Sequence, residues 1–308
     1  NFSPRDIEGF GLCWDEVHLI NGRAVMVRMQ AFGLSGPWRN RTGFAQTMEQ
    51  VSGMAWVTGW PDGPPLLPRG ACDPMAGMHA VVALLAGLDR ARETGEGELV
   101  EMTMVEAALN AAAEQIVEYS AYGTLLGRRG NRGPGASPQG LYACRGEENW
   151  LAVSVATDEH WKALRQVIGG EAWETDPATD TASGRKALHD RLDEKIAAWC
   201  GALDLDEAVE TLAAVGVPCA AVVAPVDIGA NPQLAARGLI EEVDHPVVGR
   251  HGIPGIPFHF VGREQPWLRR PPPTLGQHNN EVLGELMTRP ELDELRAKGI
   301  VGERLLGF

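Results

Sequence analysis

The chain has 308 residues, 44% of them hydrophobic, with 41 acidic and 27 basic residues and a formal net charge of -14. This length can bury the core of one large domain or two modest ones. The acidic balance argues against extended binding of nucleic-acid phosphates or of an anionic membrane surface.

The first seventy residues predict alternating helices, strands and loops. Ser3-Pro4 opens a short helix, and a second helix over residues 15–20 stops at Asn21-Gly22. Residues 24–31 alternate in hydrophobicity and predict a strand. Residues 33–37 predict a loop, residues 44–54 a helix, and residues 61–70 a Pro- and Gly-rich loop.

The next helix begins in the stretch Gly-Ala-Cys-Asp-Pro-Met-Ala-Gly-Met-His, residues 70–79. An Asp followed by Pro and a long apolar run predicts that Asp73 is the N-cap of a helix over residues 74–92. The positive end of the helix dipole favours an ionised carboxylate there. Such a carboxylate, aimed at a cleft, can act as a nucleophile on an activated acyl group. On local sequence alone, a plain cap is the commoner role.

A strand over residues 98–104 and a helix over residues 105–122 complete a β-α alternation that predicts an α/β layered domain. Residues 128–140 are a glycine-rich linker. Beyond it we expect strands at 141–144, 150–155 and 219–224, a helix capped by Thr157 and ending at Ile168, helices at 185–199 and 206–215, and a tail with a helix at 291–298. The predicted divisions are residues 1–127, the linker 128–140, a small α+β domain at 141–248, and a C-terminal segment at 249–308.

The five cysteines are Cys13, Cys72, Cys144, Cys200 and Cys219. Their odd number, wide spacing and lack of a C-x-x-C pair predict reduced, mostly buried thiols in a cytoplasmic protein, with no metal site. Cys72 beside Asp73 is expected to be a packing residue. No apolar run approaches the ~20 residues of a transmembrane helix.

Three ordered stretches carry a resemblance to a known family. They are Asn1-Phe-Ser-Pro with Arg23 to Pro37; Gly43-Phe44 with Gln50-Val-Ser-Gly53, Asp73 and Arg92 to Gly97; and Pro273 to Leu283. Together they resemble the class III CoA-transferase (CaiB/BaiF) family. The resemblance implies a Rossmann-like large domain that binds CoA, a smaller α+β domain, a C-terminal segment returning to the large domain, and two interlocked protomers.

In that family the aspartate at the position of Asp73 is the nucleophile. The resemblance implies that CoA moves between carboxylic acids through an aspartyl-acyl anhydride and an aspartyl-CoA thioester. Coenzyme A is then a substrate, and the partners are an acyl-CoA and a carboxylic acid acceptor. Exchange between two thioesters is nearly thermoneutral, so no ATP is expected.

The resemblance also implies CoA or substrate contacts by Asn1, Phe2, Thr42, Gly43, Phe44 and Ala45. Gly135, Gln139 and Gly140 lie in a stretch that resembles the family's flexible loop over the acyl-enzyme intermediate, and a plain linker is the alternative. Candidates for binding CoA phosphates are Arg39, Arg41, Arg128, Arg129 and Arg132.

The chain departs from the family pattern at several positions. Ala45 stands where an acidic residue is common, with Gln46 and Glu49 nearby in an uncertain register, and Ser3, Gly9 and Phe10 replace basic residues. Because Asn1 already falls within a CoA-contacting stretch, we expect a fragment, a split gene product or a subunit that works in a homodimer or heteromer.

Two alternative functions stay open. A related 2-methylacyl-CoA racemase needs a base on each side of the α-carbon, but Phe44 stands where its relatives carry a His. A non-catalytic, CoA-transferase-like partner subunit is the other alternative, and the retained Asp73 argues against it.

Overall fold

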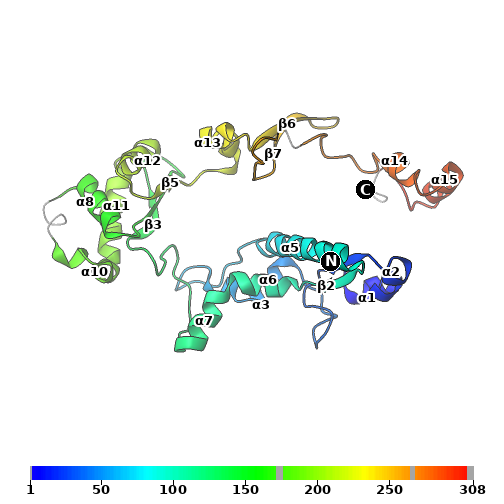
Figure 1. Ribbon diagram of the computed structural model, residues 1–308. Coiled ribbons are helices and arrows are strands. Elements are labelled where there is room, and N and C mark those ends of the chain that lie inside the picture. Colours follow the sequence, from blue (N-terminus) through cyan, green and yellow to red (C-terminus); the bar gives the residue numbers. More distant parts are fainter. Residues whose placement is uncertain (1, 171–175, 264–267, 304–308) are drawn as a thin grey trace. The chain divides into compact units, whose positions relative to one another are not determined.

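The computed structural model describes residues 2–170, 176–263 and 268–303 (Figure 1). The chain divides into two units, Asn1–Ala221 and Val222–Phe308. The first unit contains both helices and strands along its length, which agrees with the predicted mixed α/β class. Within the described residues, no helix is long and apolar enough to cross a membrane.

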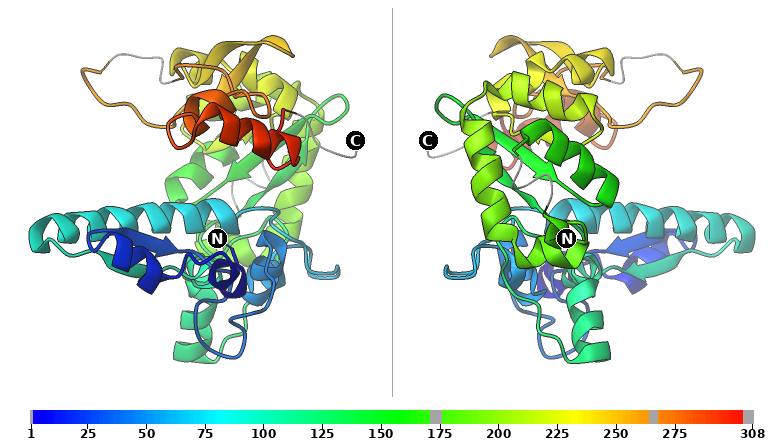
Figure 2. Two further views of the ribbon diagram at one scale, coloured as in Figure 1. Left: turned by 90° about the vertical axis from the view of Figure 1, so that its right-hand side faces the viewer. Right: turned by 90° about the vertical axis from the view of Figure 1, so that its left-hand side faces the viewer.

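The start of the first unit is organised by two parallel strands, β1 (Val25–Arg28) and β2 (Glu98–Glu101). Parallel neighbours need a crossover connection, and this one contains the 23-residue helix α5 (Cys72–Thr94). Helix α5 packs against both strands (Figure 2). The crossing is close at Gly87, where an added Cβ would lie 2.9 Å from Val25 Cγ1.

The same part of the chain also contains short helices. They are α1 (Pro4–Gly9), α2 (Trp14–Ile20), α3 (Ala45–Val51), α4 (Met54–Val57), α6 (Met104–Ala111) and α7 (Ala113–Tyr122). Ser3 caps α1 by accepting a hydrogen bond from the Asp6 N–H at 3.2 Å, as the Ser-Pro start predicts. The predicted helix at 44–54 is interrupted, because Gly53 adopts a left-handed φ of 83° between α3 and α4. The predicted helix at 105–122 is likewise divided, at Ala112.

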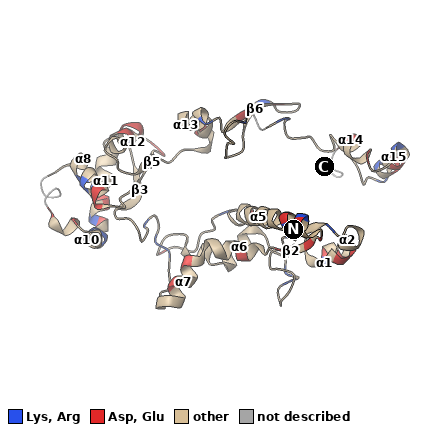
Figure 3. Ribbon diagram, in the orientation of Figure 1, with Lys and Arg blue, Asp and Glu red and all other residues tan. Residues whose placement is uncertain are grey.

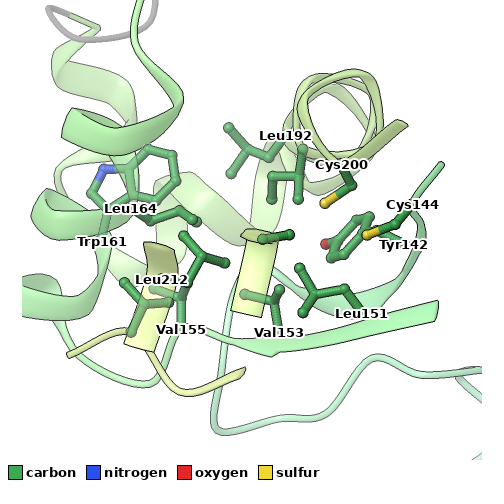
Figure 4. Packing of buried hydrophobic residues seen from close by; sticks show 13 residues of the cluster. Tyr142, Cys144, Leu151, Val153, Val155, Trp161, Leu164, Leu192, Cys200 and Leu212 are labelled. Carbon is green, nitrogen blue, oxygen red and sulfur yellow. The ribbon is translucent and has the colours of Figure 1, made fainter. Parts of the chain in front are cut away.

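The rest of the first unit is built on a three-stranded antiparallel sheet with the order β3 (Gln139–Ala143), β4 (Trp150–Ser154), β5 (Cys219–Ala221). Its helices are α8 (Asp158–Ile168), η1 (Pro177–Thr179), α10 (Ala182–Ala187), α11 (His189–Gly201) and α12 (Leu205–Ala214). Figure 4 shows helix side chains such as Leu164 and Leu192 packed over Leu151 and Val153 of β4. Thr157 caps α8, as predicted, by accepting from the His160 N–H.

The second unit contains η2 (Pro225–Ala230), α13 (Pro232–Ala236), α14 (Asn279–Leu283) and α15 (Arg289–Ala297). It also contains an antiparallel hairpin of β6 (Ile240–His245) and β7 (Gly249–Pro254). This hairpin was not predicted from the sequence, and the predicted domain boundary at Val248 lies in its turn. The domain boundaries stay a prediction.

One buried cation ties the glycine-rich linker to α8 and η1. Arg185 on α10 is 1% exposed. Its Nε donates to the Ser137 carbonyl at 2.9 Å, and its Nη1 donates to the Thr179 carbonyl at 3.1 Å. Its Nη2 forms an ion pair with Asp158 at 2.7 Å. The guanidinium thus satisfies polar groups from three separate segments.

We expect Arg185→Leu to lower the free energy of unfolding by about 3 kcal/mol or more, because it leaves buried carbonyls and a carboxylate without their donor. The control is Arg191→Leu, which removes an exposed arginine from the neighbouring helix and should cost about 0–1 kcal/mol. Urea unfolding followed by tryptophan fluorescence measures both. Equal losses in the two variants would contradict this role for Arg185.

Candidate active site

A cavity of about 450 Å³ lies at the start of α5. Its walls come from α1, the chain just after β1, the loop before α3, and the first turn of α5. The lining residues are Phe2, Ser3, Pro4, Arg5, Asp6, Gln30, Ala31, Phe32, Arg39, Asn40, Arg41, Thr42, Gly43, Phe44, Ala45, Met48, Asp73 and Met104. Segments far apart in sequence therefore meet around a cavity whose lining includes two carboxylates, Asp6 and Asp73.

Asp73 is not the N-cap of its helix, and this part of the prediction was wrong. The helix begins at Cys72 with Ala71 as the N-cap residue, so Asp73 is the second helical residue. Its side chain is exposed and lines the cavity. A different carboxylate accepts hydrogen bonds from the backbone N–H groups just before the helix, so the Asp73 carboxylate does not cap the helix.

That other side chain is Glu49 on α3, which is 0% exposed. Its Oε1 accepts from the N–H groups of Gly70 and Ala71, each at 2.8 Å. Its Oε2 accepts from the Arg69 N–H at 3.1 Å. Sequence reasoning noted Glu49 only as a question of register. A signal was available in the sequence, because Glu49 follows Met48 and lies one helical turn after Ala45. It is therefore a charged residue on the apolar, buried side of α3.

Five of the predicted contact residues line this cavity: Phe2, Thr42, Gly43, Phe44 and Ala45. Gly43 makes a close approach, since an added Cβ would lie 2.5 Å from Ala31 Cβ and 3.1 Å from the Phe32 ring. A larger residue at position 43 would therefore push the loop into the cavity or away from the end of β1. Asn1 lies outside the described residues.

The predicted loop residues lie elsewhere. Gly135 is exposed, while Gln139 and Gly140 open β3 and line two other cavities, of about 540 and 550 Å³. The Gln139 N–H donates to His189 Nε2 at 3.1 Å. Burial lowers the pKa of His189, which favours the neutral ring that can accept this bond. Among the described residues, none of these three loop positions lines the Asp73 cavity.

Of the five arginines predicted to bind CoA phosphates, two line the Asp73 cavity. Arg39 and Arg41 line the cavity together with Arg5. Arg39 forms an ion pair with Glu8 at 2.7 Å, and the Arg41 guanidinium lies 4.4 Å from the centre of the Trp38 ring. Arg128, Arg129 and Arg132 are absent from the described lining of this cavity. Arg128 donates to the Trp56 carbonyl, and Arg132 pairs with Asp190 and Asp193.

Acidic side chains are spread over many helices, among them α1, α7, α11 and α12 (Figure 3). The described lining of the Asp73 cavity holds three arginines and two carboxylates, Asp6 and Asp73, and so has a small excess of positive formal charge in an acidic chain. No group of three or more His, Cys, Asp or Glu side chains arranged to hold a metal ion occurs in the described ranges.

Cys72, next to Asp73, is fully buried and lies 3.9 Å from the sulfur of Met48. Burial, with the nearby carboxylates of Asp73 and Glu49, raises the pKa of the Cys72 thiol to about 11. The thiol is therefore protonated at neutral pH and makes a poor nucleophile.

Comparisons with known proteins point to one family. The model of CoA-transferase family III matches residues 1–279. A succinyl-CoA–D-citramalate CoA-transferase of Chloroflexus aurantiacus is 29% identical over 308 residues, covering 98% of this chain and 75% of that protein. A formyl-CoA:oxalate CoA-transferase of Escherichia coli is 31% identical over 307 residues, covering 93% of this chain and 73% of that protein.

Solved structures agree on the fold. A CaiB/BaiF family protein from Brucella suis matches with a TM-score of 0.80 and 24% identity, over 93% of this chain and 74% of that one. Rv3272 from Mycobacterium tuberculosis matches with a TM-score of 0.75 and 22% identity, over 90% of this chain and 74% of that one.

The state of Cys72 can be tested directly. In the folded protein at pH 8, iodoacetamide should leave Cys72 unmodified, because the thiol is buried and protonated. The partly exposed Cys13 is the internal comparison and should react faster. Mass spectrometry of the peptides, with a sample unfolded in urea as the full-reaction control, gives the result. Rapid native labelling of Cys72 would show that its thiol is accessible.

Proposed function

Because the chain belongs to CoA-transferase family III, we propose that it moves CoA between two carboxylic acids with Asp73 as the covalent nucleophile. The observation that carries the proposal is the exposed Asp73 carboxylate in a cavity also lined by Phe2 and by residues 42–45. These are the stretches whose resemblance to the family implies CoA contacts. A cavity that holds both the thioester and a free carboxylate is what the reaction needs.

In the first half of the proposed reaction, an Asp73 oxygen attacks the thioester carbonyl of the donor acyl-CoA. The C–S bond breaks, CoA leaves as a thiolate, and an aspartyl-acyl anhydride forms. The thiolate then attacks the Asp73 carbonyl carbon. The C–O bond of the anhydride breaks, the donor acid leaves as a carboxylate, and Asp73 becomes a CoA thioester.

The second half runs the same steps with the acceptor acid. Its carboxylate attacks the Asp73 thioester, CoA thiolate leaves, and a new anhydride forms. The thiolate then attacks the acceptor's carbonyl carbon, which yields the new acyl-CoA and restores the Asp73 carboxylate. Each step exchanges one acyl bond for another, so no redox partner or ATP takes part.

The oxyanions formed in these steps need nearby donors. At a helix start the first N–H groups lack intrahelical acceptors. Glu49 already binds the Ala71 N–H, and Pro74 has none. Cys72 is fully buried and is not among the described residues that line the cavity, so we assign this role to the N–H group of Asp73.

Arg5, Arg39 and Arg41 are the proposed partners of the CoA phosphates. They line the Asp73 cavity. Their positive charge compensates for Ser3, Gly9 and Phe10, which stand where the family has basic residues. The contact of the Arg41 guanidinium with the face of the Trp38 ring leaves guanidinium N–H groups for a phosphate. The relatives are named for small acids, so the first substrates to test are formyl-CoA with oxalate and succinyl-CoA with citramalate.

Finer features complete the proposal. The parallel β1–β2 pair with its α5 crossover supports a Rossmann-like large domain. We also propose an interlocked dimer and a cytoplasmic location. Residues 133–140 are proposed to act as a lid over the acyl-enzyme intermediate. The racemase alternative is less favoured, because no histidine is among the described residues that line the cavity. The exposed Asp73 carboxylate likewise argues against a purely structural subunit.

Asp73→Ala should lower CoA exchange at least about a thousandfold, because the variant lacks the covalent nucleophile. Its stability should stay near that of the wild type, since Asp73 makes no capping hydrogen bond. The matched control is Asp89→Ala, an exposed Asp on the same helix, which should keep full activity. Exchange of labelled acid into acyl-CoA measures both. A folded Asp73→Ala variant with wild-type turnover would refute the mechanism.

Hydroxylamine added during turnover should convert Asp73 to a hydroxamate, because both proposed intermediates are activated acyl groups on its carboxylate. Peptide mass spectrometry should find the modification only when an acyl-CoA is present. Free CoA and the acid without thioester serve as negative controls. Acylation found on Cys72 instead, with Asp73 untouched, would favour a thiol mechanism.

A further inference from the structure

We propose that Glu49 is a positioning residue of the transferase reaction, which holds the backbone of residues 69–71 so that Asp73 points into the cavity. The inference rests on the function proposed above and adds a residue to it. Glu49 does not line the cavity, so it acts through the loop and not on the substrate.

The first support is the geometry of the three hydrogen bonds. Three successive N–H groups, of Arg69, Gly70 and Ala71, converge on the two oxygens of one carboxylate. Such convergence requires an unusual backbone, and here Arg69 has a φ of 62° and Gly70 a φ of 98°. Consecutive N–H groups arranged in this way form a concave site for an anion.

The second support is the strain at Arg69. A left-handed φ is unfavourable for a residue with a side chain and persists only where the surroundings impose it. Here the buried Glu49 carboxylate supplies the hydrogen bonds that impose it. Without that carboxylate, residue 69 would relax toward a negative φ, and the chain leading into α5 would change direction.

The third support is the short path from Glu49 to the nucleophile. Ala71 is the N-cap residue of α5, and Asp73 is two residues further on. The same helix α3 also carries Met48, which packs on Cys72 beneath the first turn of α5. A shift of about 1 Å in a reacting group can cost on the order of a hundredfold in rate. The loop therefore needs only a small displacement to misplace the Asp73 carboxylate.

Glutamine is the informative replacement. It has the size of glutamate, but only one of its two terminal atoms can accept a hydrogen bond. Its NH₂ group would face at least one backbone N–H of residues 69–71 in a buried place. Glu49→Gln should thus loosen the loop without making a cavity.

We expect Glu49→Gln to lower kcat for CoA exchange about 10- to 100-fold while the KM for acyl-CoA changes less than about threefold. Hydroxamate formation at Asp73 should slow by the same factor as kcat. The matched control is Gln50→Glu, which makes the reverse change at the adjacent exposed position and should stay within about twofold of the wild type. Leu164→Ala serves as a destabilised control away from the site, with normal kcat per folded molecule.

The outcomes separate the two proposals. If the wild-type chain exchanges no CoA, the proposed function fails whatever Glu49 does. If the wild type is active and folded Glu49→Gln keeps its kcat, the positioning role is overturned. If Glu49→Gln does not fold, the comparison is made with Glu49→Asp, which keeps the negative charge but is one methylene shorter and cannot reach all three N–H groups in the same geometry. A folded Glu49→Asp variant with the wild-type kcat would also overturn the role.

Discussion

Three backbone N–H groups held by one buried carboxylate set the geometry of the candidate site. Glu49 binds residues 69–71, and this fixes where α5 begins and which way its first turn faces. Helix α5 is also the crossover between β1 and β2, pressed onto them at Gly87. Helix α5 therefore belongs both to the site and to the parallel strand arrangement. Glu49 binds the backbone at its start, and β1 and β2 pack against it near Gly87.

The part of the first unit that is built on β3, β4 and β5 shows the same use of buried polar side chains. Arg185 binds the Ser137 carbonyl, and neutral His189 accepts from the Gln139 N–H, so two side chains secure the end of the glycine-rich linker to α10 and α11. The start of that linker is bound differently, with Gly130 donating to the Gly59 carbonyl. Between these two attachments, Arg132 pairs with Asp190 and Asp193 of α11, and the Pro134 carbonyl accepts from Lys186 Nζ of α10, so the linker is bound to these helices at several points.

Local signals in the sequence predicted much of this architecture. The caps at Ser3 and Thr157 and the long helix after Asp73 were confirmed, because each depends on residues within one turn. The hairpin β6–β7 was missed, since the charged and turn-rich sequence from Ile240 to Pro254 has no clear alternation. The N-cap assignment of Asp73 was wrong for a related reason. The N–H of Ala71, the actual N-cap residue, donates to Glu49, which lies 22 positions earlier in the sequence, and no local pattern predicts so distant a partner.

The burial of Cys72 has a consequence for the proposed chemistry. An anhydride on Asp73 would form beside a thiol, and a reactive thiolate there could capture the acyl group and stop the cycle. Its protonated, solvent-excluded state suppresses that transfer. The site would thereby gain chemoselectivity, since the sulfur that meets the activated acyl group is the thiolate of CoA.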